Sequence, residues 1–178
     1  MLFSSESLIH YFQVKIYKRL GFEKKHNKRF FMKLLLLQAC LLTTALHFSF
    51  AGEKILITGN DTMQFSTKEF SVAAGEKVEL EFKNIGKLPK IAMGHNLVIL
   101  KKGVSALAFG SKVLQAGGNA TNALPESVMD EVLAHTKLLG PGESETITFD
   151  APDEPGLYQF VCTFPGHYAM MRGIMTVK

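Results

Sequence analysis

Short runs in which hydrophobic and polar residues alternate recur through the last two thirds of the chain. The clearest run is Lys77–Phe82, where three apolar residues alternate with three charged ones. A period of two predicts a strand with one buried face. Similar patterns or β-prone runs predict further strands at Lys54–Thr58, Phe70–Ala73, Asn96–Leu100, Glu143–Phe149, Leu157–Cys162 and Gly173–Val177. Because turn residues separate these short strands, we expect an all-β antiparallel sandwich.

One part of the chain has a different pattern. Ser105–Gln115 and Ser127–His135 show helical spacing, and a Gly/Asn-rich piece separates them. Ser127 followed by Asp130 resembles a capping arrangement at a helix N-terminus. We therefore expect a helical insertion between strands. His135 then lies at the end of a helix, where a structural role suffices to explain it.

The first 51 residues resemble an export leader. Met32–Ala51 alone has the positive start, the apolar run and the small residues before a cleavage site that define a signal peptide. We predict that translation starts at Met32, in preference to an unusually long basic leader, and that cleavage follows Ala51. Residues 52–178 then form a single domain. The apolar run Leu34–Leu42 is too short for a good membrane span, and we expect none in residues 52–178.

The charge and the cysteine content argue against a nucleic-acid partner and against an internal disulfide. The formal net charge is +4, but residues 1–51 carry +6 and residues 52–178 carry −2, so a nucleic-acid partner is not expected. Cys40 lies within the apolar run and should leave with the signal. A lipoprotein signal at Leu37–Cys40 is a poorer alternative, because Gln38 is too polar for it. Cys162 is then the only thiol left and cannot form an internal disulfide.

A thiol, an imidazole and a thioether that could bind a metal lie within ten residues, at Cys162, His167 and Met171. A second imidazole, His95, lies far upstream. A thiolate, two imidazoles and a weak thioether form the ligand set of a blue-copper centre. Taken singly, a buried cysteine or methionine is usually part of the core. The spacing Cys-x4-His-x3-Met, with a separate Gly-His-Asn upstream, favours a metal site over that interpretation.

Strand alternation indicates which side chains face inward. Cys162 shares a face with two aromatic residues of its predicted strand, so that face should be buried. Met171 shares the parity of Met175 and Val177, the apolar members of the last strand. We therefore expect Met171 to point into the core and Met170 away from it.

These motifs resemble the azurin family of cupredoxins. The residues that carry the resemblance are Cys162–His167 with Met171, Leu88–Lys90 with Met93–Asn96, Gly59–Asp61 with Met63–Phe65, and Ala134–Leu138. The resemblance implies an eight-stranded Greek-key sandwich with a helical flap. It also implies one copper ion per chain, held in a plane by Cys162, His95 and His167. Met171 would be the long axial ligand, opposite the Gly94 backbone carbonyl. Asn96 and the backbone of Phe164 would fix and tune Cys162.

The resemblance further implies a function. The protein would be a periplasmic carrier that shuttles single electrons and is not an enzyme. Its partners would be c-type cytochromes and periplasmic reductases or peroxidases. Electrons would pass through the edge of His167 and a docking patch of Met63, Met93, Phe164, Pro165 and Met170. A copper storage or delivery protein, and a hydrolase with Cys162 as nucleophile, are the alternatives.

The sequence also departs from the family pattern. The disulfide that azurins usually carry near the N-terminus cannot form. Leu97 stands where many azurins bury a tryptophan. Asn84-Ile85 replaces a second histidine beside the site, which puts in doubt any pH-linked tuning of the potential.

Overall fold

The computed structural model describes residues 54–178. The predicted leader, its start at Met32, its cleavage after Ala51 and the loss of Cys40 all lie outside the described residues and stay predictions. In the described part, no helix has the length and apolar character needed to cross a membrane.

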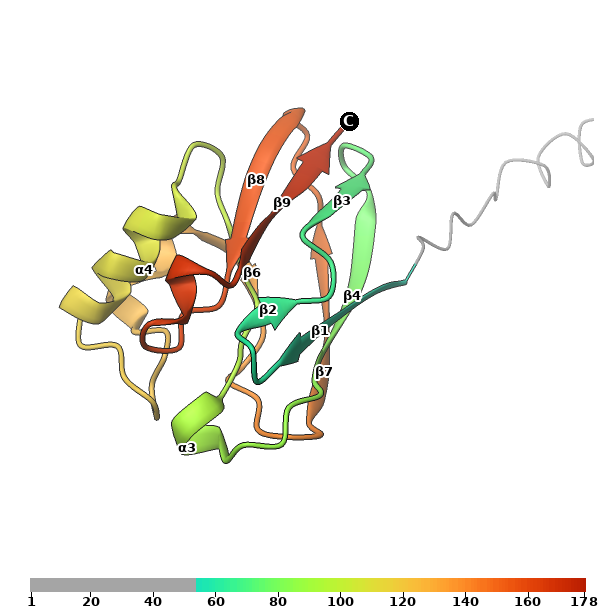
Figure 1. Ribbon diagram of the computed structural model, residues 1–178. Coiled ribbons are helices and arrows are strands. Elements are labelled where there is room, and N and C mark those ends of the chain that lie inside the picture. The colour runs from blue at the N-terminus through green and yellow to red at the C-terminus, as the bar shows by residue number, and fades with distance from the viewer. Residues whose placement is uncertain (1–53) are drawn as a thin grey trace, which may run out of the picture. The chain divides into compact units, whose positions relative to one another are not determined.

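Two β-sheets make up the fold (Figure 1). The first has the order β2-β1-β4-β7, with β1 at Ile55–Asn60, β2 at Gln64–Phe65, β4 at Lys77–Asn84 and β7 at Ser144–Asp150. The second has the order β3-β9-β8-β5-β6, with β3 at Glu69–Val72, β9 at Arg172–Val177, β8 at Gly156–Val161, β5 at Val98–Leu100 and β6 at Val132–His135. The helical elements are α3 (Lys90–Met93), α4 (Ala106–Gln115) and the 3-10 turns η1 (Glu126–Glu131) and η2 (His167–Ala169).

The predicted all-β sandwich with a helical insertion is confirmed, with two differences in its strands. The described residues form nine strands, because the two-residue β2 pairs with the end of β1. The sheets are mixed and not purely antiparallel, since β1 runs parallel to β4 and β3 runs parallel to β9. The parallel pairs arise because β3, which precedes β4 in the chain, belongs to the opposite sheet.

Two buried clusters fill the molecule. The main core includes Phe82 of β4 and Phe160 of β8. The second cluster includes Phe109 and Val113 of α4, packed with residues of β5, β6 and β8. Successive residues of β5 serve the two clusters in turn, which explains why the run Asn96–Leu100 is apolar throughout.

The predicted helix Ser105–Gln115 is confirmed as α4, and the Ser105 side chain accepts a hydrogen bond from the Ala108 N–H at its start. The predicted helix Ser127–His135 is wrong. Only the 3-10 turn η1 forms there; it begins after Pro125, and no side chain caps it. The following residues are strand β6, because they pair with the open edge of β5. His135 consequently lies on an edge strand, where its Nδ1 is 3.2 Å from the Thr136 carbonyl oxygen.

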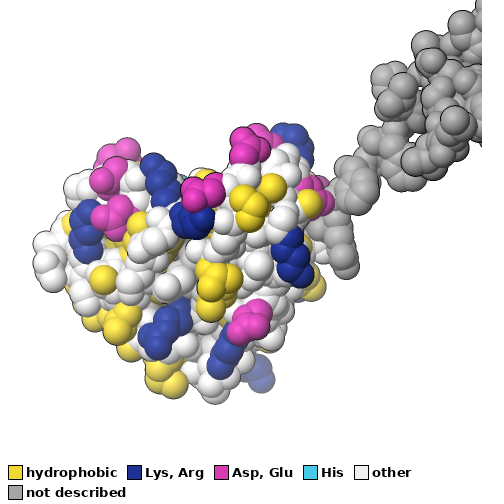
Figure 2. Space-filling view, turned by 90° about the horizontal axis from the view of Figure 1, so that it is seen from above, with side chains coloured by type: hydrophobic (Ala, Val, Ile, Leu, Met, Phe, Trp, Pro, Cys, Tyr) yellow, Lys and Arg dark blue, Asp and Glu magenta, His cyan; other side chains and the backbone are white. Residues whose placement is uncertain are grey.

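The end of the sandwich near the C-terminus is seen in Figure 2, from above the view of Figure 1. Lysine, arginine, aspartate and glutamate side chains are interspersed on this face with separate hydrophobic ones. A face of mixed charge is not the continuous basic surface that nucleic-acid-binding proteins use.

Candidate metal centre

Three predicted ligands meet inside the sandwich. One donor atom each from His95, Cys162 and His167 lies within 4.8 Å of the others, and all three residues are buried. The Cys162 Sγ is 3.9 Å from Nδ1 of His95 and 3.6 Å from Nδ1 of His167. Both imidazoles therefore turn the same ring nitrogen toward the sulfur, which leaves one small space bounded by three donors.

Cys162 and His167 are positioned by the turn that follows β8. The Cys162 N–H donates to the Met171 carbonyl at 2.9 Å, and the His167 N–H donates to the Phe164 carbonyl at 3.0 Å. Gly166 has φ +83°, a left-handed conformation that favours glycine, and it brings the chain back to start η2 at His167. The Phe164 ring packs on the His167 imidazole with centroids 4.6 Å apart.

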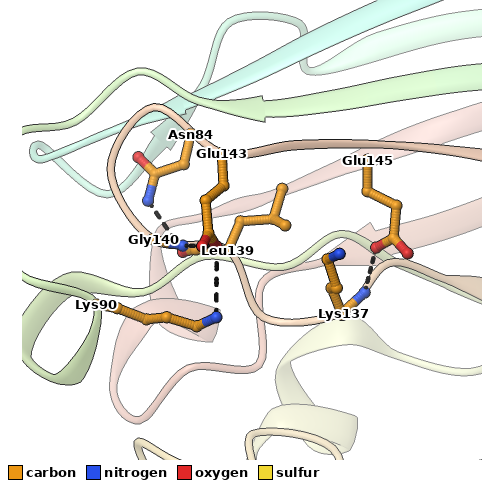
Figure 3. Close-up of polar contacts among 7 residues, drawn as sticks. All are labelled: Asn84, Lys90, Lys137, Leu139, Gly140, Glu143 and Glu145. Atoms are coloured by element: carbon orange, nitrogen blue, oxygen red, sulfur yellow. Dashed lines mark hydrogen bonds and ion pairs between the residues drawn. The ribbon is translucent and has the colours of Figure 1, made fainter.

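His95 reaches the same place from another part of the chain. It follows α3 and forms an isolated bridge with Leu139, in which the two backbones exchange hydrogen bonds of 3.0 and 2.7 Å. Asn84, buried at the end of β4, donates its side-chain Nδ2–H to the same Leu139 carbonyl at 3.1 Å (Figure 3). Its Oδ1 accepts the Gly86 N–H at 2.8 Å. A polar residue of the first sheet thus supports the backbone that holds His95.

Acidic side chains brace the same loop from outside (Figure 3). Glu143 Oε2 accepts the Gly140 N–H at 2.7 Å and lies 3.4 Å from Lys90 Nζ. The pKa of Glu143 is lowered, mainly by the Gly140 hydrogen bond and then by Lys90. Glu145 similarly accepts the Lys137 N–H at 2.6 Å. The loop that pairs with His95 is therefore held by hydrogen bonds before and after Leu139 in the sequence.

A hydrogen-bonded pair lies beside Cys162. Asn96 Oδ1 accepts the Thr163 N–H at 2.8 Å, and Asn96 Nδ2 donates to Thr163 Oγ1 at 2.8 Å. Burial raises the pKa of the Cys162 thiol to about 12, although backbone N–H groups of Asn96 and Phe164 favour the thiolate and oppose the shift. The thiol is thus neutral and buried when no metal is bound, and a cation must displace its proton.

The two imidazoles are also held neutral. Burial lowers the pKa of His167 to about 4, with a smaller contribution from His95. Burial likewise lowers the pKa of His95, against the Asn60 carbonyl and the Asp61 carboxylate. His95 Nε2 is buried without a partner at hydrogen-bond geometry, so the Asn60 carbonyl favours the protonated ring without forming a full hydrogen bond. Neutral imidazole is the form that binds metals.

The two methionines differ as the strand parity predicts. Met171 is fully buried, whereas the Met170 side chain is 57 % exposed. The backbone of Gly94 is buried beside His95, at the C-terminal end of α3. The ligand roles of Met171 and the Gly94 carbonyl stay predictions.

The residues predicted for the docking patch lie at different depths. Met63, Met93 and Pro165 are half-buried, and Phe164 is buried. Met63 has φ +55°, a conformation that is rare for residues other than glycine. Met63 is the last residue of the three-residue loop between β1 and β2, a position that often adopts this conformation, and its N–H donates to the Asn60 carbonyl at 3.0 Å. The patch as a docking surface stays a prediction.

Sequence reasoning missed the residues that support His95. The sequence analysis predicts no supporting role for Asn84 or Leu139. Nothing local marks Leu139, because its role depends on a backbone pairing across 44 positions of the chain. Asn84 carried a usable signal, since a polar residue continues the buried face of an alternating strand.

The donor set fits copper. Thiolate sulfur suits Cu(I), and imidazole suits both oxidation states, whereas a site for calcium or magnesium would present oxygen ligands. The three donors are buried, converge on one space, and are neutral before the thiol loses its proton. Among the described residues, this is the one group of three or more such side chains close enough to hold a metal ion.

Comparisons with known proteins agree with this chemistry. Residues 52–178 match the family described as copper binding proteins, plastocyanin/azurin family. Azurin of Alcaligenes faecalis is 40 % identical over 122 residues, which cover 67 % of this chain and 93 % of that protein. Azurin of Pseudomonas aeruginosa is 38 % identical over 125 residues, or 68 % of this chain and 82 % of that protein.

Solved structures extend the likeness to the fold. The dithionite-reduced auracyanin of Roseiflexus castenholzii is 38 % identical, with a TM-score of 0.60, and covers 72 % of this chain and 98 % of its own. The family match covers most of the chain, and the sequence identity to family members is high enough to show membership. The chain therefore belongs to the plastocyanin/azurin family of copper-binding proteins.

Proposed function

We propose that this blue copper electron-transfer protein works in the periplasm, where it shuttles single electrons between redox proteins. His95, Cys162 and His167 would hold the copper, together with Met171 and the Gly94 carbonyl. The observation that carries the proposal is the convergence of one thiol and two neutral imidazoles in a buried space. Bound copper would supply a one-electron Cu(I)/Cu(II) couple.

The protein's own residues would keep the site in one geometry. Hydrogen bonds to Asn96 fix Thr163, the residue next to Cys162, and the pairing with Leu139 fixes His95. These supports are hydrogen bonds within the protein, and they do not depend on the charge of the metal. Because supporting residues that lock the ligands reduce the rearrangement between oxidation states, electron transfer should be fast.

Electrons would leave and enter beside His167. Its imidazole packs on Phe164, and the exposed Met170 follows in the same turn. Further exposed apolar side chains, Leu88 and Ile91, lie just before and within α3, the helix that carries Met93. A small apolar surface suits brief encounters with partners. By family analogy these partners would be c-type cytochromes and periplasmic reductases or peroxidases.

A visible absorption spectrum tests the proposal. Cu(II) is added to the purified protein, and we expect an intense blue band that a one-electron reductant bleaches and an oxidant restores. Cys162→Ser should abolish the band, whereas Met170→Leu should keep it. A folded protein that binds copper without this band would contradict the electron-carrier function and favour copper storage or delivery.

The hydrolase alternative has a separate test. A nucleophilic cysteine needs an accessible thiolate. Here burial raises the pKa of Cys162 to about 12, so a neutral alkylating reagent should modify the folded, metal-free protein only slowly at neutral pH. Rapid modification under these conditions would favour the hydrolase alternative, with Cys162 as nucleophile.

A further inference from the structure

Helix α4 contacts the metal-site turn through one glycine and one tyrosine. Gly110 lies in the middle of α4, and Tyr168 lies in η2, directly after His167. The two elements lie side by side in the fold, although they are far apart in the sequence (Figure 1).

The contact leaves no room for a side chain on Gly110. A Cβ placed there would lie 2.1 Å from Tyr168 Cγ, 2.3 Å from its Cβ and 2.5 Å from its Cδ2. Ordinary contacts of a Cβ are 3.4–4 Å. The Tyr168 side chain thus sits directly against the helix backbone, in a socket that only glycine provides. A glycine within a helix is unfavourable compared with alanine, so helix propensity does not explain its presence.

The helix is firmly seated at this point. Phe109 and Val113, on either side of Gly110, are buried in the second cluster, and Tyr168 packs against the same cluster. Lys112 Nζ is 2.6 Å from Glu131 Oε1, which ties α4 to η1. The socket therefore belongs to a fixed part of the fold.

Hydrogen bonds connect the backbone of η2 to the residues that follow it. The His167 carbonyl accepts the N–H groups of Met170 at 3.0 Å and Met171 at 2.8 Å. The Arg172 guanidinium also donates to the carbonyls of Tyr168 and Ala169. Because the Tyr168 Cβ lies only 2.3 Å from the place of a Gly110 Cβ, rotation of the Tyr168 side chain cannot relieve that clash, and the backbone next to His167 must move.

We propose that Tyr168, seated against Gly110, is a positioning residue that holds the His167 imidazole beside Cys162. Helix α4 would then act as a support for the metal-site turn. The inference rests on the proposed function only in taking His167 as a copper ligand, because the contact itself needs no metal.

A set of substitutions tests the inference. Gly110→Ala should force Tyr168 out of its socket, and Tyr168→Ala should remove the anchor, so each should shift the visible absorption maximum and the reduction potential of the copper-loaded protein. Because the Cβ of residue 168 would itself lie 2.3 Å from the new Cβ, only Tyr168→Gly removes the whole contact, and adding Gly110→Ala to Tyr168→Gly should cause no further shift. The stability effect should also change sign: Gly110→Ala should lower the melting temperature of the natural chain and raise that of the Tyr168→Gly variant, where no side chain opposes the new Cβ and alanine is the better helix former.

Metal-free protein provides a second measurement. Tyr168→Ala should speed hydrogen exchange of the Met170 and Met171 amides by about tenfold or more, because the turn loses its support. Lys112→Ala is the matched control: it alters α4 without touching Tyr168, and loss of a partly exposed ion pair leaves the helix in place, so the spectrum, the potential and these two amides should not change.

Three outcomes would overturn the inference. These are an unchanged spectrum and potential in both single variants, unchanged exchange at the two amides, or an equal effect of Lys112→Ala. If the natural chain itself lacked the blue band, the proposed function would fail, whereas the amide exchange would still decide the role of Tyr168.

Discussion

Replacing Gly59 by alanine should disturb the metal centre from the side of β1. A Cβ at this position would lie 2.7 Å from the Met171 Cε, 3.0 Å from Phe82 Cζ and 3.4 Å from His95 Cδ2. Ordinary contacts start at 3.4 Å, so the methionine methyl group must retreat by about 0.7 Å or more. Phe82 lies within the main core and can move little.

The size of the effect follows from two opposing contributions. Overpacking a core usually costs about 1–3 kcal/mol. Alanine in place of glycine in a strand recovers roughly 0.5–1 kcal/mol of backbone free energy. We therefore expect Gly59→Ala to lower the free energy of unfolding of the metal-free protein by roughly 0–2.5 kcal/mol. If Met171 is the axial ligand, its retreat should also shift the reduction potential of the copper protein.

Urea unfolding of four metal-free proteins measures the contact: the natural chain, Gly59→Ala, Met171→Ala and the double variant. Met171→Ala removes the closest contact of the new side chain, so the penalty of Gly59→Ala should be smaller in that background, with the contact to Phe82 Cζ remaining. A coupling smaller than about 0.5 kcal/mol, the usual limit for independent sites, would refute the reasoning. An unchanged potential in copper-loaded Gly59→Ala would separately contradict the axial role of Met171.

Three further predictions follow from the site. Met171→Leu should raise the reduction potential measured by voltammetry, because it removes a weak donor to Cu(II) from a buried site. The exposed Met170→Leu should leave the potential unchanged. A tenfold change in the relative affinity of the site for Cu(I) and Cu(II) corresponds to about 59 mV. Asn84→Leu should lower the free energy of unfolding by about 1–3 kcal/mol in urea, because it leaves the Gly86 N–H without its partner, and a smaller loss would show that water replaces the amide. The metal-free protein should lose stability as the pH falls from about 6.5 toward 4, because the unfolded chain takes up a proton on His167 that burial disfavours in the folded one. The loss should approach at most about 3 kcal/mol, and a His167→Gln variant with the same pH profile would disprove the assignment.

Local sequence patterns determined much of this protein. The alternation in Lys77–Phe82 predicted β4, and the helical spacing of Ser105–Gln115 predicted α4. The parity of the last strand separated buried Met171 from exposed Met170. These features could be predicted because the direction of each side chain follows the local period of the strand or helix. That period depends on neighbouring residues alone.

The residues of the candidate metal centre could also be proposed from the sequence. The spacing of Cys162, His167 and Met171 lies within one strand end and one turn, and the types of side chain indicate the metal. His95 was predicted from residue type, because a second imidazole completes the ligand set, although no local pattern places it beside Cys162. The structure places its Nδ1 at 3.9 Å from the cysteine sulfur.

Only the tertiary structure decided the rest. Residues after η1 became strand β6 because β5 offered an unpaired edge, and two strand pairs became parallel because the chain crosses between sheets. The support of His95 by Leu139 and the socket of Gly110 for Tyr168 have no local signature. Backbone pairing and close packing join residues that are distant along the chain, so their free energy depends on where the whole fold brings them and not on the residues beside them.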